Sequence, residues 1–379
     1  MSSRDDPQGP APTAPATAPS AAAEALEFPC PNCGAETTWD PDVDALACAY
    51  CGTTTPVPRA AGAIEEHALE AVGEGARGLG LETRTADCRN CGARVAFGDV
   101  DTAATCVFCG SANVLAHESN RNTLRPESLI PLDVGRATVE ENFRRWVRGL
   151  WFRPDALRRL ASFDAVGVYV PYWTFDARVR SRWSADSGTY YWTTQVVPVV
   201  VNGRVRMRTR RVRRVRWRPA SGVREDRYDD HLVNASGGIP DDLARRLGGF
   251  DTSKLVPYRP EYLAGLRAEE YRLDLEQGWD RARDALVGLQ RARCAGDVPG
   301  DTYRDLEADH DFDEVRWKHV LLPIWSLRYE HGGKAYTVLV HGQTGRVNGR
   351  APWSWVKLLL LLPLALAVGL LLAVVVVAL

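Results

Sequence analysis

Alternation of apolar and polar residues is strongest in the middle of the chain, where it predicts β-strands. Val166, Val168 and Val170 alternate with other residues across 165–173, up to a break expected at Pro171, after which an aromatic run continues. Asn202-Gly203 separates two β-rich stretches and is the strongest short signal for a two-residue hairpin turn. The hairpin strands are expected at 189–201 and 204–218, and three closing strands at 302–309, 315–329 and 334–341.

Apolar residues recur at helical spacing in four segments, at 63–76, 137–149, 240–247 and 264–293. The longest of these segments carries an apolar stripe made of Leu266, Tyr271, Leu275, Trp279, Leu286 and Leu289. Strands and helices are mixed along the chain, and the clearest strand pair is a hairpin. Residues 127–350 are therefore expected to form one α+β domain with a mostly antiparallel sheet.

The stretches before this domain contain two segments with little capacity to form a core. Residues 1–27 are rich in Ala, Pro, Ser and Thr, and they lack the basic and apolar regions of a signal peptide. Such a composition cannot bury enough apolar surface to become ordered, so a disordered tail is expected. The stretch 59–84 joins a short helical pattern to a glycine-rich run and is expected to be a helical and glycine-rich linker.

At the C-terminal end, 358–379 is a run of 22 residues without a charged or polar side chain. At a rise of about 1.5 Å per residue such a helix spans the roughly 30 Å hydrocarbon core, which predicts a transmembrane helix at 356–379. Trp353 and Trp355 suit the aromatic belt of a membrane interface. Basic residues flank the same end, so the positive-inside rule predicts a single-pass protein of the cell membrane with cytoplasmic N-terminal domains.

Small residues repeat on one side of the predicted membrane helix, at Ala365, Gly369 and Ala373. Such a face lets two helices approach closely, which predicts a homodimer formed through this helix. Alanine is common in any apolar helix, so the same residues also suit a helix that only tethers the protein to the lipid bilayer.

Eight of the nine cysteines follow one doubled frame near the start of the chain. In each half two C-x2-C pairs are separated by 14 residues, and every cysteine recurs 58 positions later. Each C-x2-C turn (here a knuckle) presents two thiolates, and two knuckles close a tetrahedral zinc site. Glycine follows each pair, where the turn favours a positive φ. The frame predicts two zinc ribbons, ribbon 1 at 28–58 and ribbon 2 at 85–117, with the ligands Cys30, Cys33, Cys48, Cys51, Cys88, Cys91, Cys106 and Cys109.

Two alternatives bear on these cysteines. Disulfides would suit a secreted chain, although no signal for secretion is present. Two complete C-x2-C pairs leave no open coordination position, so each Zn²⁺ is expected to be structural rather than catalytic. Metal binding, worth on the order of 10 kcal/mol, would supply most of the folding free energy of each small ribbon.

Cys294 stands alone in a helical stretch and is expected to be an inert small residue.

Composition indicates a folded chain of 379 residues with room for two or three domains. The net charge of −1 argues against a protein that coats nucleic acid over its whole surface. Only four of the 47 basic residues are lysine, which is typical of a GC-rich genome and lowers the weight of an arginine count.

Even so, 204–218 carries nine arginines and no acidic residue. Arg206, Arg208, Arg213 and Arg216 are candidate contacts for the phosphates of nucleic acid or of anionic lipid. The alternative is the solvated face of an edge strand, where charges discourage aggregation.

Motifs of known catalytic chemistry are missing from the sequence. It has no G-x4-G-K-[ST] phosphate loop, no G-x-S-x-G and no H-E-x-x-H, and Gly332-Gly333-Lys334 is typical of a hairpin turn. Asp229-Asp230-His231 and Asp309-His310-Asp311 could perform acid–base chemistry, but such groups in loops are usually only solvated. The sequence therefore predicts no catalytic residues and a protein that is not an enzyme.

Several later motifs make the chain similar to a family of bacterial membrane proteins with doubled zinc ribbons and a C-terminal anchor. Members are often called TFIIB-type zinc-ribbon proteins or primosomal protein N′/replication factor Y-like proteins. The resemblance implies an adaptor role, because some members accompany stomatin-like (SPFH) membrane-scaffold proteins; it implies no reaction. Helicase activity is not supported, since the ATP-binding motif is absent. The matching motifs are Cys30-Pro31-Asn32-Cys33-Gly34-Ala35, Val170-Pro171-Tyr172-Trp173-Thr174-Phe175, Trp217-Arg218-Pro219-Ala220-Ser221-Gly222, Leu321-Leu322-Pro323-Ile324-Trp325 and His341-Gly342-Gln343-Thr344-Gly345-Arg346.

Two functions from different classes fit these features. The first is a membrane-anchored adaptor or scaffold, in which the zinc ribbons present binding surfaces and the α+β domain recruits a protein partner. The second is a membrane-tethered nucleic-acid-binding protein that uses the ribbons together with the arginine strand. A steep salt dependence of binding to DNA or RNA would favour the second function.

Overall fold

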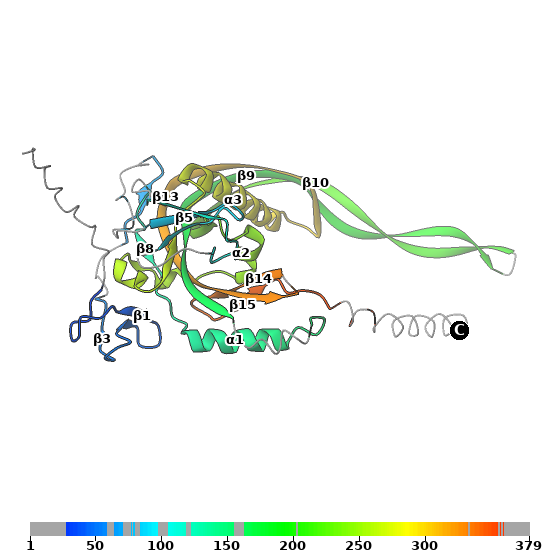
Figure 1. Ribbon diagram of the computed structural model, residues 1–379. Coiled ribbons are helices and arrows are strands. Elements are labelled where there is room, and N and C mark those ends of the chain that lie inside the picture. Colours follow the sequence, from blue (N-terminus) through cyan, green and yellow to red (C-terminus); the bar gives the residue numbers. More distant parts are fainter. Residues whose placement is uncertain are drawn as a thin grey trace, which may run out of the picture.

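Three long strands form the frame of the protein in a computed structural model (Figure 1). β9 (Asp164–Val201) lies in the centre, paired antiparallel with β10 (Arg204–Asn234) on one edge and with β13 (Thr302–His331) on the other. The structure describes residues 28–58, 64–70, 77, 79, 84–97, 105–118, 123–154, 163–201, 204–332, 334–354, 357 and 359.

Shorter strands extend this frame into a sheet with the path β11-β8-β13-β9-β12-β6-β5-β7. β4 and β14 also pair with β13, and β15 pairs with β14. Only the β12–β9 and β8–β13 pairs are parallel, so the prediction of a mostly antiparallel sheet is confirmed. The bounds are β4 (His67–Ala68), β5 (Arg84–Cys88), β6 (Arg94–Phe97), β7 (Val114–Glu118), β8 (Ser128–Leu129), β11 (Val256–Pro257), β12 (Arg267–Glu269), β14 (Lys334–His341) and β15 (Val347–Gly349).

Three α-helices of the described chain pack on this sheet, and we call the sheet with these helices the body. α1 (Arg136–Arg148) agrees with the predicted helix to within a residue at each end, and α2 (Asp241–Leu247) agrees as well. α3 (Leu275–Asp297) begins 11 residues after the predicted start, because β12 occupies part of 264–274 and Asp274 caps the helix by accepting from the amide of Gln277 at 2.8 Å. Short 3-10 turns lie at Thr252–Lys254 and Pro260–Leu263.

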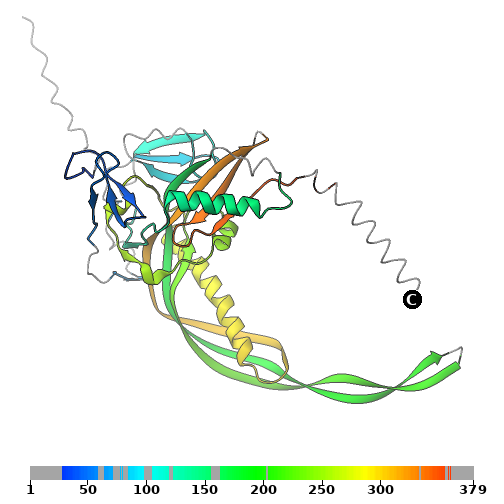
Figure 2. The same ribbon diagram turned by 90° about the horizontal axis from the view of Figure 1, so that it is seen from below.

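α3 runs along the three long strands and closes their inner face (Figure 2). Gly278 allows the close approach, because a Cβ atom there would lie 2.7 Å from the indole of Trp173. Further along, Leu286 packs with Val179 in a small buried cluster. Cys294 is 0% exposed in the next cluster, as expected for an inert small residue.

Two predicted strand breaks are absent, and β9 and β13 are each continuous. Pro171 does not interrupt β9, because its carbonyl accepts from Ala235 on the edge opposite β13, and the position of its missing N–H faces the same way. No strand pairs with this edge at Pro171, because β12 pairs with β9 only as far as Tyr169 and the pairing of β10 begins at Tyr172. The predicted strands 302–309 and 315–329 are joined across a mostly polar stretch in which 310–313 pair with β9 and Glu314 lies in a bulge.

β-Bulges bend the long strands into the curve seen in Figure 2. The register shifts by one residue at three places, and each contains an acidic residue with positive φ: Asp230 at 50°, Asp305 at 51° and Glu314 at 52°. A bulge increases local twist and bending. These polar residues resemble loops in the sequence, which explains why the continuous strands were missed.

The prediction of a helix at 63–76 is wrong for 64–70, the part of this range that the structure describes. His67–Ala68 forms β4 and pairs with Arg316 and Trp317 of β13. The indole of Trp317 donates to the carbonyl of Ala68 at 3.1 Å, and His67 lies 3.1 Å from Glu127. Partners on β13 therefore override a local helical spacing.

Other expectations concern residues that the structure does not describe. The tail at 1–27 and most of the membrane segment at 356–379, including Ala365, Gly369 and Ala373, lie outside the described residues. Within the part of the chain that is described, no helix has the length and apolar character needed to cross a membrane.

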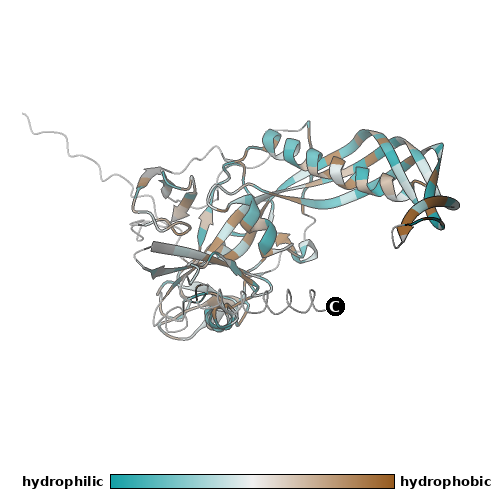
Figure 3. Cartoon of the chain, turned by 90° about the vertical axis from the view of Figure 1, so that its right-hand side faces the viewer, coloured by the Kyte–Doolittle hydropathy of each residue, from teal (hydrophilic) through white to brown (hydrophobic). Residues whose placement is uncertain are grey.

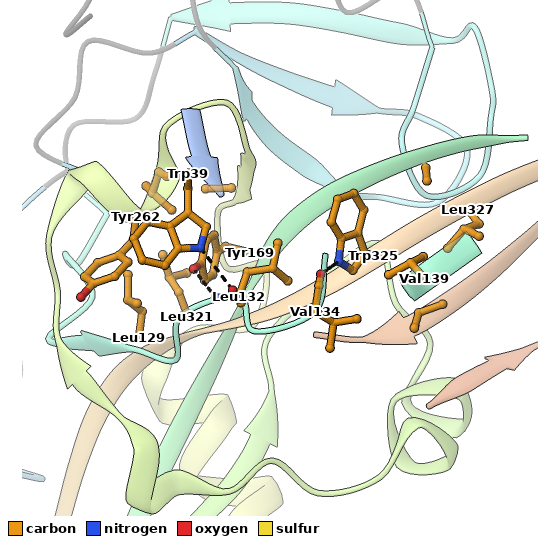
Figure 4. Packing of buried hydrophobic residues seen from close by; sticks show 14 of the residues in the cluster. Trp39, Leu129, Leu132, Val134, Val139, Tyr169, Tyr262, Leu321, Trp325 and Leu327 are labelled. Atoms are coloured by element: carbon orange, nitrogen blue, oxygen red, sulfur yellow. Dashed lines mark hydrogen bonds between the residues drawn. The ribbon is translucent and has the colours of Figure 1, made fainter. Parts of the chain in front are cut away.

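Ribbon 1 forms a separate three-stranded sheet, β1 (Thr38–Asp40), β2 (Ala45–Ala47) and β3 (Thr54–Thr55), which docks on the body through Trp39. The Trp39 indole is 5% exposed, donates to the carbonyl of Leu132 at 3.2 Å and meets Tyr262 edge-on at 4.8 Å (Figure 4). Its backbone amide also donates to Ala264 at 2.9 Å. One tryptophan thus joins ribbon 1 to the main core.

The contribution of this contact can be measured by substitution. We expect Trp39→Ala to lower the free energy of unfolding by about 3–5 kcal/mol, because it removes a large buried ring. Trp39→Phe should lower the free energy of unfolding by less, because an aromatic ring is retained. This variant loses mainly the hydrogen bond to Leu132, which is worth about 1 kcal/mol. Denaturant unfolding of the full chain in detergent measures both values, and wild-type stability in the alanine variant would contradict the docking role.

Candidate metal centres and an arginine-rich arm

All four knuckles have the same backbone geometry. In the first, the amide of Gly34 donates to the carbonyl of Cys30 at 2.8 Å, and the amide of Cys30 donates to Ala35 at 2.7 Å. The other three knuckles repeat both bonds. The four glycines have φ between 73° and 84°, which confirms the prediction of positive φ after each pair; they are Gly34, Gly52, Gly92 and Gly110.

The knuckles bring the eight predicted ligands together in two groups of four, Cys30, Cys33, Cys48 and Cys51 in ribbon 1 and Cys88, Cys91, Cys106 and Cys109 in ribbon 2. Within each group all sulfur atoms lie within 4.8 Å of one another, and the shortest separations are 3.5 Å. A tetrahedral site with bonds of about 2.3 Å has sulfurs about 3.8 Å apart, whereas a disulfide needs about 2.05 Å. All nine cysteines are free. The donor set therefore fits two metal-binding sites, and no pair of these sulfurs lies at disulfide distance.

The electrostatics of these sites also favour a bound cation. The hydroxyl of Thr53, 3.2 Å from the sulfur of Cys51, lowers the pKa of that thiol to about 5. In ribbon 2 the contact with Cys91 lowers the pKa of Cys106 to about 5, and the same contact raises the pKa of Cys91. Ionisation of one thiol thus opposes ionisation of its neighbour, and a divalent cation would relieve the repulsion between two thiolates.

Ribbon 2 is built into the body. β6 pairs with β12, so β5, β6 and β7 continue the large sheet. The knuckle of Cys106 is held by side chains of the body: Ser326 donates to the carbonyl of Val107 at 2.6 Å, Arg328 donates to that of Cys106 at 3.0 Å, and Thr337 donates to that of Phe108. The range predicted as a zinc ribbon and the range predicted as an α+β domain therefore share one sheet.

An aromatic residue completes this docking. Phe108 lies between the ligands Cys106 and Cys109, is 3% exposed, and packs against Gly238, where a Cβ atom would lie 2.4 Å from its ring. A Cβ atom at Gly237 would likewise lie 2.5 Å from the carbonyl oxygen of Gly92. Sequence analysis did not identify Phe108 as a site residue.

The equivalent residue of ribbon 1, 58 positions earlier, is Tyr50. It lies between Cys48 and Cys51 but is 85% exposed. Cys33 and Cys51 are exposed too, whereas their counterparts in ribbon 2 are only partly exposed. The recurrence of an aromatic residue inside the second knuckle is the sequence signal that could have drawn attention to both positions.

Beyond the end of β13, the paired strands continue alone as a two-stranded arm, Thr189–Val201 with Arg204–Arg216 (Figure 1). Val201 pairs directly with Arg204, so the predicted hairpin around Asn202-Gly203 is confirmed. At about 3.3 Å per residue the arm extends roughly 40 Å.

The arm separates the four candidate anion contacts onto two faces. Side chains alternate along a strand, so Arg206, Arg208 and Arg216 share one face and Arg213 lies on the other. Arg213 is stacked over Tyr190 with its guanidinium 4.3 Å from the ring centre, and the guanidinium of Arg216 lies 5.4 Å from the ring centre of Tyr191.

The two acidic and histidine clusters lie in strands rather than in the loops expected for them. Asp229-Asp230-His231 forms the bulge of β10, and Lys318 lies 2.7 Å from Asp230 and 3.0 Å from Glu66. Burial lowers the pKa of Lys318, but the hydrogen bonds to these carboxylates outweigh that effect and raise it. Lys318 thus supplies the positive charge of this cluster. Asp309-His310-Asp311 belongs to β13, where His310 lies 2.7 Å from the hydroxyl of Ser181.

Comparisons with known proteins add one relative and no assigned role. No protein-family model and no solved structure match the chain. The chain is 26% identical over 334 residues to "Uncharacterized protein YdjG" of Bacillus subtilis (strain 168), an alignment that covers 87% of this chain and 91% of the relative. The resemblance to the doubled zinc-ribbon family stays a prediction.

Metal release should distinguish the two ribbons. We expect two metal ions per full-length chain by elemental analysis, and a competing chelator should remove the ion of ribbon 1 about tenfold faster or more, because its site is exposed and that of ribbon 2 is held in the body. Cys51→Ser should abolish the fast phase, and Cys109→Ser the slow one. A single ion, or a single phase unaffected by either variant, would contradict this assignment.

The ribbons should also contribute unequally to stability. Cys48 and Cys106 are equivalent ligands and are equally buried, at 3% and 4% exposure. We expect Cys106→Ser to lower the melting temperature of the full chain by about 10 °C or more, because it loosens strands of the large sheet. Cys48→Ser is the matched control and should cause less than half that shift; equal shifts would mean that the large sheet does not depend on ribbon 2.

Proposed function

We propose that the protein is a membrane-anchored adaptor that holds a protein partner at the cytoplasmic face of the membrane. The contrast between the two equivalent knuckle aromatics carries this proposal. The body supplies a surface for the ring of Phe108 and buries it, so that only 3% of this residue is exposed. Tyr50 is fixed between two metal ligands in the same way, yet its ring is 85% exposed. A rigid, exposed tyrosine is a favourable anchor for a protein interface.

We propose further that both metal ions are zinc and that both are structural. Four thiolates at tetrahedral separations suit Zn²⁺, which has no geometric preference of its own. All four coordination positions are filled by protein, which leaves none for water or substrate. Two of the residues that could perform acid–base chemistry are engaged, Asp230 with Lys318 and His310 with Ser181. These features support an adaptor more than an enzyme.

Exposed aromatic residues support membrane attachment at the point where the chain approaches its apolar C-terminal segment. Trp353 is 56% exposed, and the guanidinium of Arg153 stacks on its ring at 3.9 Å. Trp151 and Phe152, in the turn after α1, are 78% and 44% exposed. The backbone of 351–354 is tied to this turn, since the amide of Ser354 donates to Phe152 at 2.8 Å. Tryptophan and arginine at one site suit the interface of a bilayer.

Nucleic-acid binding is the second candidate function, and the arm is the observation that favours it. Eight arginines without an acidic residue would attract phosphates, and the exposed rings of Tyr191 and Trp192 could stack with bases. This candidate predicts a steep fall of affinity with salt. It leaves Tyr50 without a role.

The adaptor proposal is tested at Tyr50. Proximity labelling from the full-length protein in its native membrane should identify a small set of partners, for which a stomatin-like scaffold protein is the first candidate. Tyr50→Arg should reduce their labelling at least about tenfold, because a charge replaces a hot-spot ring. Metal content and melting temperature should not change, since the ring makes no buried contact.

The control for this experiment is Tyr303→Arg, which alters another exposed tyrosine, on β13 (46% exposed), and should leave the labelling unchanged. An unchanged set of partners in Tyr50→Arg would contradict the proposal, and so would an equal loss in both variants.

A further inference from the structure

The charges of the arm are uncompensated, in contrast to those of the strands from which it extends. In the three-stranded part, arginines pair with carboxylates: Arg182 with Asp311 at 3.0 Å, Arg227 with Glu314 at 2.7 Å and Arg304 with Asp186 at 2.8 Å. No arginine of the arm has an acidic partner among the described residues. A general excess of arginine in the chain does not explain why such ion pairs occur in the three-stranded part and not among the described residues of the arm.

The end of the arm has two chemically different faces. Arg204, Arg206, Arg208 and Arg210 alternate on one face of β10, where the half-buried Val199 and Val197 of β9 pair with Arg206 and Arg208. The opposite face consists mainly of apolar side chains that cross-pair in the hairpin and are 55% to 72% exposed: Val196, Val200, Val205 and Met207. Figure 3 shows hydrophobic segments beside hydrophilic ones at the end of the arm. A solvated edge strand would not need an apolar face of this kind.

Three occupants could cover this surface, and the charges decide between them. A second copy of the arm would bury the apolar face but would place eight more arginines beside the first eight, with no acid on either arm. A nucleic acid would neutralise the arginines but would leave the apolar face in water. An anionic bilayer meets both needs, because acyl chains accept the apolar face and long arginine side chains reach the phosphates above it.

We infer that the arm is a lipid-binding element that lies in the interface of an anionic bilayer, with its valine and methionine face inserted and its arginines at the phosphates. Its direction agrees with this role. The arm and the segment 351–354, which leads toward the apolar C-terminal segment, extend from the same side of the body in Figures 1 and 2. The inference rests on the proposed attachment to a membrane but not on the adaptor role, so loss of partners in the Tyr50 experiment leaves it unaffected.

Hydrogen exchange of the full chain in vesicles tests the inference. The protein is reconstituted into vesicles of phosphatidylcholine alone or of phosphatidylcholine mixed with phosphatidylglycerol, and exchange of peptides covering 189–216 is compared with that in detergent. The outward amides of both arm strands have no partner strand, so binding should slow them. We expect roughly tenfold slower exchange only in the anionic vesicles, with the difference reduced at high salt.

Variants test each face separately. Replacing Arg206, Arg208 and Arg210 by glutamine should abolish the slowing, whereas the same replacement of Arg245, Arg246 and Arg283, which are exposed on α2 and α3, removes equal charge and should not. Replacing Val200, Val205 and Met207 by serine should also abolish it. Unchanged exchange of β13 peptides and unchanged metal content show that each variant is folded.

Three results would overturn the inference. Exchange in the arm that is equal in anionic vesicles, neutral vesicles and detergent would show that the arm does not bind lipid. Slowing caused by duplex DNA or by RNA in detergent, and not by vesicles, would assign the arm to nucleic acid. Slowing in detergent that increases with protein concentration would assign it to a second copy of the chain.

Discussion

Backbone hydrogen bonding along both edges of β9 is the constraint on which the rest of the structure depends. From Asp164 to Gly188 this strand pairs with β13, and from Tyr172 onward it pairs with β10. Ribbon 2 reaches the same strand through β12, and β13 in turn receives β4, β8 and β14. β13 begins at Thr302, which pairs with Gly188, and beyond this pair β9 and β10 continue with unpaired outer edges and become the arm. The position at which one neighbour stops therefore separates the body from the arm.

The doubled cysteine frame shows how one local design serves two purposes. Identical knuckle bonds and sulfur separations make the two metal sites nearly alike, so their difference lies in what surrounds them. The knuckle of Phe108 is surrounded by side chains of β13 and β14 that satisfy its carbonyl groups. The equivalent knuckle of Tyr50 has no such cover in the described part of the chain, because ribbon 1 docks through Trp39 in its hairpin instead. This leaves the knuckle of Tyr50 exposed.

The arm illustrates why a charge count alone does not define a site. The chain as a whole is nearly neutral, and several arginines of the three-stranded region form ion pairs with carboxylates on neighbouring strands. The arm has no neighbouring strand, so its arginines lose these partners and its apolar face loses its cover at the same place. Both consequences follow from the absence of a third strand beside the arm. Together they are the basis for the inferred contact with an anionic bilayer.

The sequence by itself determined the features that depend on close neighbours in the chain. The cysteine spacing and the glycines fix the knuckles, Asn202-Gly203 fixes the hairpin, and the apolar spacing around Phe143 fixes α1. Only the tertiary structure decided the features that depend on distant partners. Pro171 remains inside a strand because the position of its missing N–H faces an edge of β9 where no strand pairs. The polar stretches at Asp230, Asp305 and Glu314 form bulges rather than loops because β9 pairs with the strand on both sides of each of them. Burial of Phe108 and exposure of Tyr50 have the same origin, since equivalent residues acquire different roles when only one of them meets a surface made by strands more than 200 residues away.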